Sequence, residues 1–497
     1  MATVKAPSGT SSRASGASTG NEACLRAAEA GRYLVEQADV ATLVMYLEGV
    51  RDPAGLLALG RRARQLDKPV VVLAAGRSSA GRRAALSHTA AVAGDDLLLS
   101  ALCRQAGLER VRDDDELVDV VQGLRRGAAL PHRPRVAVVT MSGGAGAVLA
   151  DRLTDVGSQW TQQCGAQVAD VPALSPTIRA AVTELGAGAV GDQNPIDLSG
   201  MFGRSIDRVT ALCRLLDAEA DIDAVVLYFT FGDRLLDAYR TLADTAAGLP
   251  TPTWLVWAAA PPGAVEAVGR PDVVVPSIGA AVRQVPALVD RAASVLRRIS
   301  PPRVLARPVE LPDLPGLSEA VAAGVLTALG VSYVPSVVGG SADEVAALVD
   351  DAGWPGPYVI KGDAVDVPHR AQHGLIRLGV SRADLLDEAR QTLDTARKLS
   401  VEQPRVVIQP QVRHDVELNI GAVRDPVYGP VLVVGPGGAG IEARGAERDA
   451  LLLPAGLMLA RPDIAEIDLN PVVLTTDGRL IAVDSLIIRS PEGVHDV

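Results

Sequence analysis

The sequence has 497 residues, of which 48% are hydrophobic and 22% charged, and its net charge is −11 at pH 7. This apolar content excludes a disordered chain, and the length predicts about three domains. An acidic chain without a long basic run is unsuited to nucleic acid, which binds clustered Lys and Arg. No apolar run reaches the length of a membrane span, and the N-terminus is polar where a signal peptide needs an apolar stretch. We therefore expect a cytoplasmic protein that binds no membrane.

The predicted elements divide the chain into five regions. Residues 1–20 are rich in Ser, Gly, Ala and Thr, bury too little apolar surface to offset the entropy of ordering, and are predicted to be a disordered tail. Short β-branched runs alternate with helical stretches over residues 21–130 and again over 131–299, which predicts two tandem parallel-sheet α/β domains. Five prolines within residues 300–315 predict a linker. Strands and a closing hairpin predict a mixed α+β domain over 316–497.

One loop has a composition that packing does not explain. The segment GRSSAGRRAALSHTAAVAGD, residues 76–95, places glycines, small residues and hydroxyls around His88. Exposed small residues let backbone N–H groups come close to an anion. A lone histidine is more often a hydrogen-bonded loop side chain than a reactive one, so the residues alone leave both interpretations of His88 open.

Two other segments favour phosphate chemistry. The strand VAVVT runs into MSGGAGAVLAD, a glycine turn at a predicted helix start, where free N–H groups and the helix dipole bind phosphate. Many α/β proteins have such turns. Lys361 lies in the apolar strand VIKG, and a lysine there is costly unless its charge has a partner, which favours a functional role.

Together these segments resemble the nucleoside-diphosphate-forming acyl-CoA synthetases, the family of ADP-forming acetate–CoA ligase and a relative of succinyl-CoA synthetase. The His88 segment is similar to the family's phosphohistidine loop, and the resemblance runs from about residue 18 to the C-terminus. It implies two tandem flavodoxin-like parallel-sheet domains followed by a shortened α+β ATP-grasp domain. The other matching segments are MYLEGVRD, VTMSGGAGAVLAD, NPIDLSG, VIKGDAVDVPHR, and VELNIGAVRDPVYGPVLVVGPGG followed by EIDLNPVV.

The resemblance implies a phosphohistidine mechanism. His88 would carry a phosphoryl group, and Glu48 would orient its ring by accepting one N–H, which leaves the other nitrogen free to attack phosphorus. A surface or helix-capping glutamate is the alternative for Glu48. His369 would relay the phosphoryl group between the nucleotide and His88. Its neighbour Arg370 stands where the family more often has Lys.

The resemblance also assigns phosphate-binding and nucleotide-binding residues. Asn194 and Asp197 would line the cleft at the glycine turn, although a structural Asn-Pro turn would have the same sequence. Lys361 would reach the phosphates of ATP. The remaining assignments are Ser142, Gly143 and Gly144 at a phosphate, Gln409 and Val412 at the adenine, and Glu417 at the ribose.

A magnesium site is expected in the closing hairpin. Mg²⁺ bound with ATP takes hard oxygen ligands beside the phosphates, and Asn470 and Asp484 supply an amide oxygen and a carboxylate on neighbouring strands. Asp468 would lie next to these ligands without binding the metal itself. Exposed hairpin residues are the alternative for all three.

The expected activity is an ADP-forming acyl-CoA synthetase that joins a small carboxylic acid to CoA, with ATP and Mg²⁺, through phosphohistidine and acyl phosphate. The family's N-terminal CoA-binding domain has no counterpart in this sequence, so we expect a separate CoA-binding subunit within a homo- or hetero-oligomer. Two alternatives stay open: a non-catalytic or partner-dependent regulatory protein on the same scaffold, and an ATP-grasp ligase with a non-CoA acceptor. The sequence does not predict which acid is used.

Overall fold

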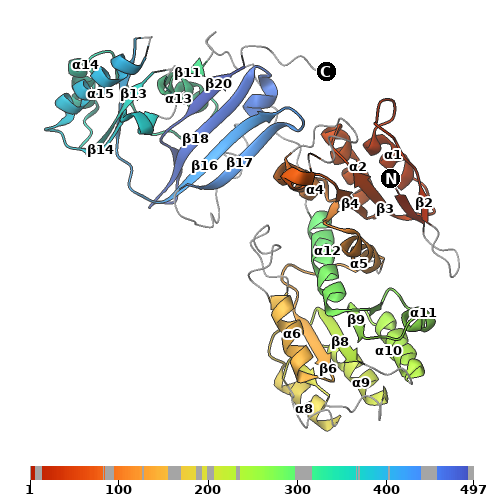
Figure 1. Cartoon of the computed structure of the whole chain (residues 1–497). Helices are drawn as coiled ribbons and strands as arrows, with labels where there is room; N and C mark the ends of the chain where they lie inside the picture. Colours follow the sequence, from red (N-terminus) through yellow and green to blue (C-terminus); the bar gives the residue numbers. More distant parts are fainter. Residues whose placement is uncertain are drawn as a thin grey trace. The chain divides into compact units, whose positions relative to one another are not determined.

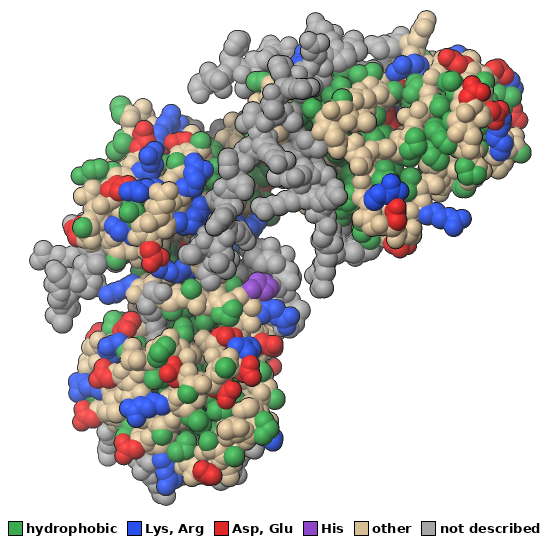
Figure 2. All heavy atoms as spheres, turned by 180° about the vertical axis from the view of Figure 1, so that it is seen from behind, with side chains coloured by type: hydrophobic (Ala, Val, Ile, Leu, Met, Phe, Trp, Pro, Cys, Tyr) green, Lys and Arg blue, Asp and Glu red, His purple; other side chains and the backbone are tan. Residues whose placement is uncertain are grey.

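The computed structural model of the protein has two compact units, residues Met1–Ile299 and Ser300–Val497, and each is described by itself (Figure 1). Acidic and basic side chains are intermixed on the face of the molecule seen in Figure 2. Within the part of the chain that the structure describes, no helix is both long enough and apolar enough to cross a bilayer. The described residues are 2–5, 14–81, 83, 95–125, 128–154, 169–185, 193–198, 206–230, 235–296, 316–364, 367, 370–400, 403–437 and 456–490.

The first sheet of unit 1 has the strand order β2-β1-β3-β4-β5, and its last three strands are parallel. The strands read as runs of Val and Leu because helices cover them. Aspartates begin three of these helices by accepting backbone N–H bonds, as Asp52 does from Gly55 at 2.7 Å. The elements are β3 (Val40–Leu47), β4 (Val70–Ala74), β5 (Glu109–Val111), α1 (Ala27–Val35), α2 (Pro53–Gln65), α4 (Asp96–Ala106) and α5 (Asp114–Leu124).

Two described segments of the predicted tail are short strands. Strand β1 (Ala2–Lys5) pairs antiparallel with β3 and with β2 (Ala14–Gly16) at the edge of the first sheet. A β-ladder is held by backbone groups and needs no apolar side chain, so a stretch rich in Ser, Ala and Thr can extend an existing sheet.

The second sheet of unit 1 is parallel throughout, in the order β10-β9-β8-β6-β7. Its central strands are buried on both faces, as their continuous apolar sequences predict. The strands are β6 (Val136–Thr140), β7 (Ile196–Asp197), β8 (Ala224–Thr230), β9 (Thr253–Ala258) and β10 (Val274–Val275). The helices are α6 (Gly143–Thr154), α8 (Pro176–Glu184), α9 (Ile206–Asp217), α10 (Leu236–Gly248), α11 (Ala264–Val268) and α12 (Ile278–Leu296).

The two sheets of unit 1 share an apolar core. One cluster of buried side chains joins Val71 and Val111 of the first sheet to Val136 and Trp254 of the second. Helix α12 returns beside α5 (Figure 1), and Arg283 on α12 donates to Asp119 on α5 at 2.7 Å. The two predicted α/β regions therefore have a sheet each but one common interior.

Unit 2 contains two antiparallel sheets. The larger has the order β11-β20-β18-β16-β17 with β19 paired to β18, and the smaller has the order β12-β15-β13-β14. The predicted closing hairpin is confirmed between β18 and β19, where Gly478 takes a φ of +83° in the turn.

The larger sheet consists of β11 (Gly316–Leu317), β16 (His414–Asp425), β17 (Gly429–Gly437), β18 (Ile464–Thr475), β19 (Leu480–Ala482) and β20 (Leu486–Arg489). The smaller consists of β12 (Val337–Gly339), β13 (Tyr358–Asp363), β14 (Ile376–Val380) and β15 (Arg405–Pro410). The helical elements are α13 (Glu319–Ala328), α14 (Ala342–Ala352), α15 (Leu385–Leu399) and the 3-10 turn η2 (Arg370–His373). Both sheets contribute to the site described next.

Candidate functional site

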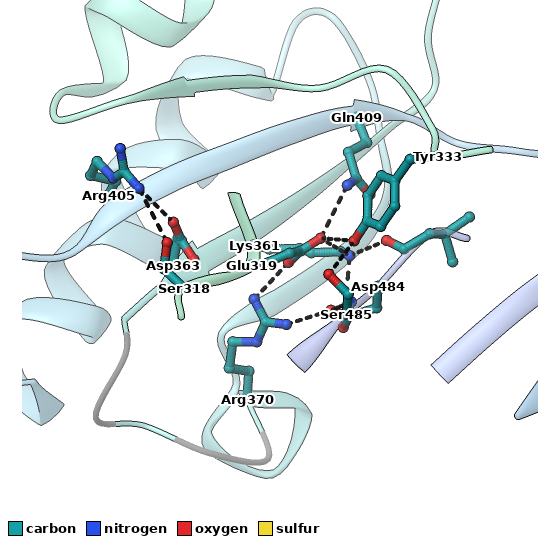
Figure 3. Close-up of polar contacts among 11 residues, drawn as sticks. Ser318, Glu319, Tyr333, Lys361, Asp363, Arg370, Arg405, Gln409, Asp484 and Ser485 are labelled. Carbon is teal, nitrogen blue, oxygen red and sulfur yellow. Dashed lines mark hydrogen bonds and ion pairs between the residues drawn. The ribbon is translucent and has the colours of Figure 1, made fainter. Parts of the chain in front are cut away.

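Four charged side chains meet in the interior of unit 2 (Figure 3). Lys361 Nζ donates to Glu319 Oε1 at 2.7 Å. Arg370 donates from Nη1 to Glu319 Oε2 at 2.6 Å and from Nη2 to Asp484. Their side chains are between 1% and 17% exposed. We call these four residues the Glu319 cluster, in which two cations share two carboxylates.

The cluster connects elements that are far apart in the sequence. Glu319 is the first residue of α13, where the helix dipole favours a carboxylate. Lys361 lies on β13 of the smaller sheet, and its ammonium also donates at 2.6 Å to the carbonyl of Val483, which follows β19 of the larger sheet. Asp484 is the next residue. The cluster is therefore a charged junction between the two sheets.

Neutral polar groups complete the surroundings of Glu319. Gln409 on β15 donates from Nε2 to Glu319 Oε1 at 3.1 Å. The hydroxyl of Tyr333 lies 3.3 Å from the same oxygen and 3.2 Å from Ser485 Oγ. Glu319 is thus the most heavily bonded group of the cluster, since each of its oxygens accepts at least one charged donor.

The pKa shifts show which carboxylate is the more firmly ionised. Burial raises the pKa of Glu319, but the charges and hydrogen bonds of Lys361 and Arg370 outweigh it, so the pKa lies below its ordinary value. Burial, with the charge of Glu319, holds the pKa of Asp484 above its ordinary value despite the two cations. Burial lowers the pKa of Arg370, but the carboxylates outweigh it and raise the pKa. The guanidinium is therefore a permanent charge in this interior.

A second ion pair lies beside the cluster (Figure 3). Arg405 Nη2 donates at 3.2 Å to Asp363 Oδ2 and at 3.2 Å to Ser318 Oγ. Asp363 Oδ1 is buried without a hydrogen-bond partner among the described residues. Burial raises the pKa of Asp363, against the hydrogen bond from Ser318. The strand that carries Lys361 thus ends on a second buried carboxylate.

The structure separates the predicted nucleotide-binding residues into two groups. Lys361 and Gln409 both contact Glu319. Val412 and Glu417 meet instead at His414, whose Nδ1 lies 3.0 Å from the Val412 carbonyl and whose Nε2 lies 2.9 Å from Glu417 Oε1. The first group lies in the buried cluster, and the second lies around a partly exposed histidine.

The predicted magnesium ligands, Asn470 and Asp484, are not arranged to coordinate a cation. Asp484 Oδ1 accepts from Arg370 and, at 2.7 Å, from the backbone N–H of Ser485, and Asp484 Oδ2 is 3.7 Å from Lys361 Nζ. Asn470 is exposed on β18, whereas Asp484 lies in the cluster. Mg²⁺ needs oxygen atoms free to coordinate it in near-octahedral geometry. As arranged here, Asp484 does not fit a resident Mg²⁺, because cationic side chains occupy it.

The predicted phosphate turn in unit 1 has the expected local form. The Ser142 N–H donates to Thr140 Oγ1 at 2.9 Å, and the Ser142 carbonyl accepts from the Gly146 N–H at 2.9 Å as α6 begins. Gly144 has open space around its α-carbon, whereas a Cβ on Gly143 would lie 3.0 Å from Asp197 Oδ2. Asp197 therefore lies beside the helix start.

Asn194 has a different environment from the one implied by the resemblance. Its Oδ1 accepts from the Val138 N–H at 2.9 Å, and its Nδ2 donates to the carbonyls of Val136 at 2.9 Å and Pro172 at 3.0 Å. All three partners are backbone groups. This arrangement favours the structural alternative for Asn194, because the amide holds the chain around β6.

Glu48 lies at the carboxyl end of the central strand of the first sheet, close to where the His88 segment begins. It follows β3 directly and is half-buried. The Leu47 carbonyl accepts from the Ala75 N–H at 2.9 Å, so Glu48 lies next to the start of residues 76–95. The predicted catalytic histidines His88 and His369 lie outside the described residues.

Glu319 is a site residue that the sequence did not predict. In LSEAVAAGVL it looks like an ordinary acidic residue after a helix-capping serine. The available signal was Lys361, because a buried ammonium requires a carboxylate. That requirement does not identify a partner 42 residues away.

Comparison with protein families gives matches at both ends of the chain. Residues 6–124 match the succinyl-CoA-ligase-like flavodoxin domain, and residues 315–454 match the ATP-grasp domain. The first match includes part of the stretch predicted to be a tail. The predicted fold class is confirmed: a parallel-sheet flavodoxin-like domain and an ATP-grasp domain with antiparallel sheets occur in one chain.

Several curated proteins are similar over much of the chain. Trans-feruloyl-CoA synthase FCS1, from an unknown prokaryotic organism, is 26% identical over 95% of this chain and 72% of its own length. The ADP-forming acetate–CoA ligase I of Archaeoglobus fulgidus is 26% identical over 93% of this chain and 72% of its own length. The ADP-forming acetate–CoA ligase II subunit alpha of Pyrococcus furiosus is 32% identical over 27% of this chain and 29% of its own length.

A solved structure is similar over a smaller part. The dinucleotide-forming acetyl-coenzyme A synthetase 1 of Candidatus Korarchaeum cryptofilum, in complex with phosphate and ADP, is 21% identical, with a TM-score of 0.47. The similarity covers 56% of this chain and 59% of that one.

Proposed function

We propose that this chain, a homologue of the ADP-forming acyl-CoA ligases, is an acid–thiol ligase that converts a carboxylic acid, CoA and ATP into acyl-CoA, ADP and phosphate. The observation that carries the proposal is Lys361, a buried ammonium on β13 of the ATP-grasp domain with Gln409 on the adjacent strand. A cation of this kind suits the phosphates of ATP.

The proposed reaction has four steps, and each step forms one bond as it breaks another. A ring nitrogen of His369 attacks the γ-phosphorus of ATP and ADP leaves, and a ring nitrogen of His88 then attacks the phosphorus of phospho-His369, which restores His369. The carboxylate of the acid attacks the phosphorus of phosphohistidine, which forms an acyl phosphate and restores His88. The CoA thiolate then attacks the acyl carbon, and phosphate leaves. Each step replaces one bond by another, so the energy of ATP reaches the thioester without direct condensation.

The roles of individual side chains belong to the same proposal. Glu48 orients His88 at the carboxyl end of β3, and His369 relays the phosphoryl group. The Ser142 hydroxyl and the N–H groups of Gly143 and Gly144 bind phosphate at the start of α6, supported by their position at the end of β6. In unit 2, Lys361 and Gln409 contact the nucleotide. Val412 and Glu417, which meet at His414, serve the adenosine part.

An assembly with a separate CoA-binding subunit in a homo- or hetero-oligomer is also part of the proposal. It is supported by the relatives of Pyrococcus furiosus that are named as alpha subunits of ADP-forming acetate–CoA ligases. The acid is defined only by its reacting group, a carboxylate that becomes an acyl phosphate.

The decisive experiment is intact-protein mass spectrometry after incubation with ATP and Mg²⁺. The wild type is expected to gain one phosphoryl group that is stable in alkali and lost in acid, and the double variant His88→Asn/His369→Asn is expected to gain none. His132→Asn, which changes an exposed histidine away from the predicted sites, is the matched control and should behave as the wild type.

The outcomes separate the alternatives. An adduct that persists in the double variant His88→Asn/His369→Asn contradicts the phosphohistidine mechanism. Nucleotide binding without any adduct favours the regulatory protein. Discharge of the adduct by an acid and an amine, with no requirement for CoA, favours the ligase with a non-CoA acceptor.

A further inference from the structure

Arg370 occupies a position between two carboxylates that would otherwise attract a metal ion. Its two terminal nitrogens donate separately, one to Glu319 and the other to Asp484, and the side chain is 12% exposed (Figure 3). A guanidinium is planar and always charged, so it can bridge two carboxylates in a fixed geometry. Arg370 thereby takes both the charge and the space that a cation would need.

The charge balance of the cluster depends on this bridge. Glu319 and Asp484 contribute two negative charges, and Lys361 and Arg370 contribute two positive charges. Lys361 is 2.7 Å from Glu319 but 3.7 Å from Asp484, so it compensates mainly Glu319. Without Arg370, Asp484 would be left with poor compensation in a buried place, which is strongly unfavourable.

The oxygen atoms around the bridge are of the kind that a divalent cation prefers. The two carboxylates face Arg370, and the hydroxyls of Tyr333 and Ser485 lie 3.2 Å apart beside the Glu319 cluster. Hard divalent cations such as Mg²⁺ and Mn²⁺ take carboxylate and neutral oxygen ligands. The arrangement thus supplies ligands for a cation and at the same time a side chain that occupies them.

We propose that Arg370 is the resident cation of this site and that it excludes divalent cations from the nucleotide-free chain. The disagreement between the expected magnesium ligand Asp484 and its observed partners is the basis of this inference. The inference deepens the proposed function and rests on it only in taking the cluster as part of a nucleotide site. The exclusion itself follows from the contacts of Arg370.

The test is a titration of the nucleotide-free, full-length chain with Mn²⁺ alone, followed by the electron paramagnetic resonance of the free ion. The wild type is expected to show no saturable site below about 1 mM. Arg370→Met, which keeps an unbranched stem but removes the charged guanidinium, is expected to acquire one site that binds Mn²⁺ at least about tenfold more tightly. Adding Asp484→Asn to Arg370→Met is expected to remove the acquired site.

Arg377→Met is the matched control. Arg377 also pairs with a glutamate, Glu388, at 3.2 Å, but its side chain is 38% exposed, and this variant should bind Mn²⁺ no better than the wild type. If Arg370→Met does not fold, as judged by circular dichroism, Arg370→Gln replaces it as a neutral variant that retains N–H donors.

Two results would overturn the inference. One is a tight Mn²⁺ site in the wild type that Asp484→Asn abolishes, which needs no Arg370 variant. The other is a site in Arg370→Met that survives Asp484→Asn. Calorimetric titration of the wild type with ATP is a separate measurement: absence of nucleotide binding removes the proposed function but leaves the Mn²⁺ result intact.

Discussion

Asn194 in unit 1 and Glu319 in unit 2 are both organising side chains, but they act by different means. Asn194 is neutral, and its three hydrogen bonds go to backbone groups of Val136, Val138 and Pro172. Glu319 is charged, and its partners are side chains from separate elements. Asn194 fixes the path of the chain beside a glycine turn. Glu319 neutralises cations that would be unfavourable in the interior without a carboxylate partner.

The difference shows how the two proposed phosphate sites are built. At the start of α6 the available groups are backbone N–H groups, which small residues expose. In the Glu319 cluster the available groups are long charged side chains, which must be neutralised while no ligand is bound. The first kind of site depends on chain geometry, and the second depends on charge balance.

Replacing Glu319 by Gln should have the largest effect on stability. The substitution leaves Lys361 and Arg370 buried with one carboxylate between them, and breaking such a buried pair costs about 3 to 5 kcal/mol. Urea unfolding followed by the fluorescence of Trp354, in unit 2, would measure the loss. Glu388→Gln is the control, because its partner Arg377 is partly exposed, and the loss should be below about 0.5 kcal/mol. Equal losses of unfolding free energy in the two variants would mean that the buried cluster stabilises the fold no more than a partly exposed ion pair does.

Replacing Asn194 by Ala should have an intermediate effect. It leaves one N–H and two carbonyls without their partner, at a cost of about 1 to 3 kcal/mol. Asn194→Asp should be no better than Ala, because a carboxylate cannot donate to the carbonyls of Val136 and Pro172. Urea unfolding followed by the fluorescence of buried Trp254 would measure both. Asn21→Ala, which removes one exposed bond of 3.2 Å, is the control and should be nearly neutral.

Replacing Asp463, a peripheral carboxylate of unit 2 that pairs with Arg461 and Arg489, should have the smallest effect on stability. It tests whether an ion pair contributes to stability outside the buried cluster. Hydrogen bonds from Arg461 and then Arg489 lower the pKa of Asp463 to about 2 from an ordinary value of 3.8. A lowered pKa stabilises the fold at pH values above the ordinary one, and this stabilisation is lost as the pH falls toward the folded value. Asp463→Asn should therefore cost about 1 kcal/mol at pH 7.

The pH dependence makes that prediction specific. The difference between wild type and Asp463→Asn in urea unfolding should stay constant down to about pH 4 and shrink as the pH falls further. Asp394→Asn removes an ion pair in which Asp394 lies 3.5 Å from Arg397 and its carboxylate is 66% exposed. This variant should not differ measurably from the wild type at pH 7 or below pH 4. A difference for Asp463→Asn that does not change with pH would show that its ionisation contributes nothing.

The sequence predicted those features that depend on local pattern. Buried parallel strands followed from apolar runs such as Val70–Ala74, and the turn at Gly478 followed from its glycine. The need for a partner to Lys361 was also predictable. Its identity was not, because Glu319 and Val483 are 42 and 122 residues away and are brought together only by the packing of two sheets.

The two interpretations of Asn194, phosphate binding and a structural turn, can be separated only by the contacts of its side chain in the folded protein. An Asn-Pro pair before a short strand has the same sequence in a phosphate site and in a structural turn. What favours one of them is the pair of carbonyls at 2.9 and 3.0 Å from its Nδ2, which belong to residues outside the motif. Asp484 is a carboxylate, the kind of ligand that Mg²⁺ takes, but its observed partner is Arg370, which the sequence marked only as a departure from the family.

The apolar core shared by the two sheets of unit 1 limits how this part of the protein can be recombined. Val71 and Val111 pack in the same cluster as Val136 and Trp254, and α12 covers α5 through Arg283 and Asp119. A chimera that exchanged only the first sheet for that of a homologue would place foreign side chains against an unchanged α12. Unit 1, Met1–Ile299, should therefore be exchanged as one block in chimeras, although it contains two separate α/β sheets.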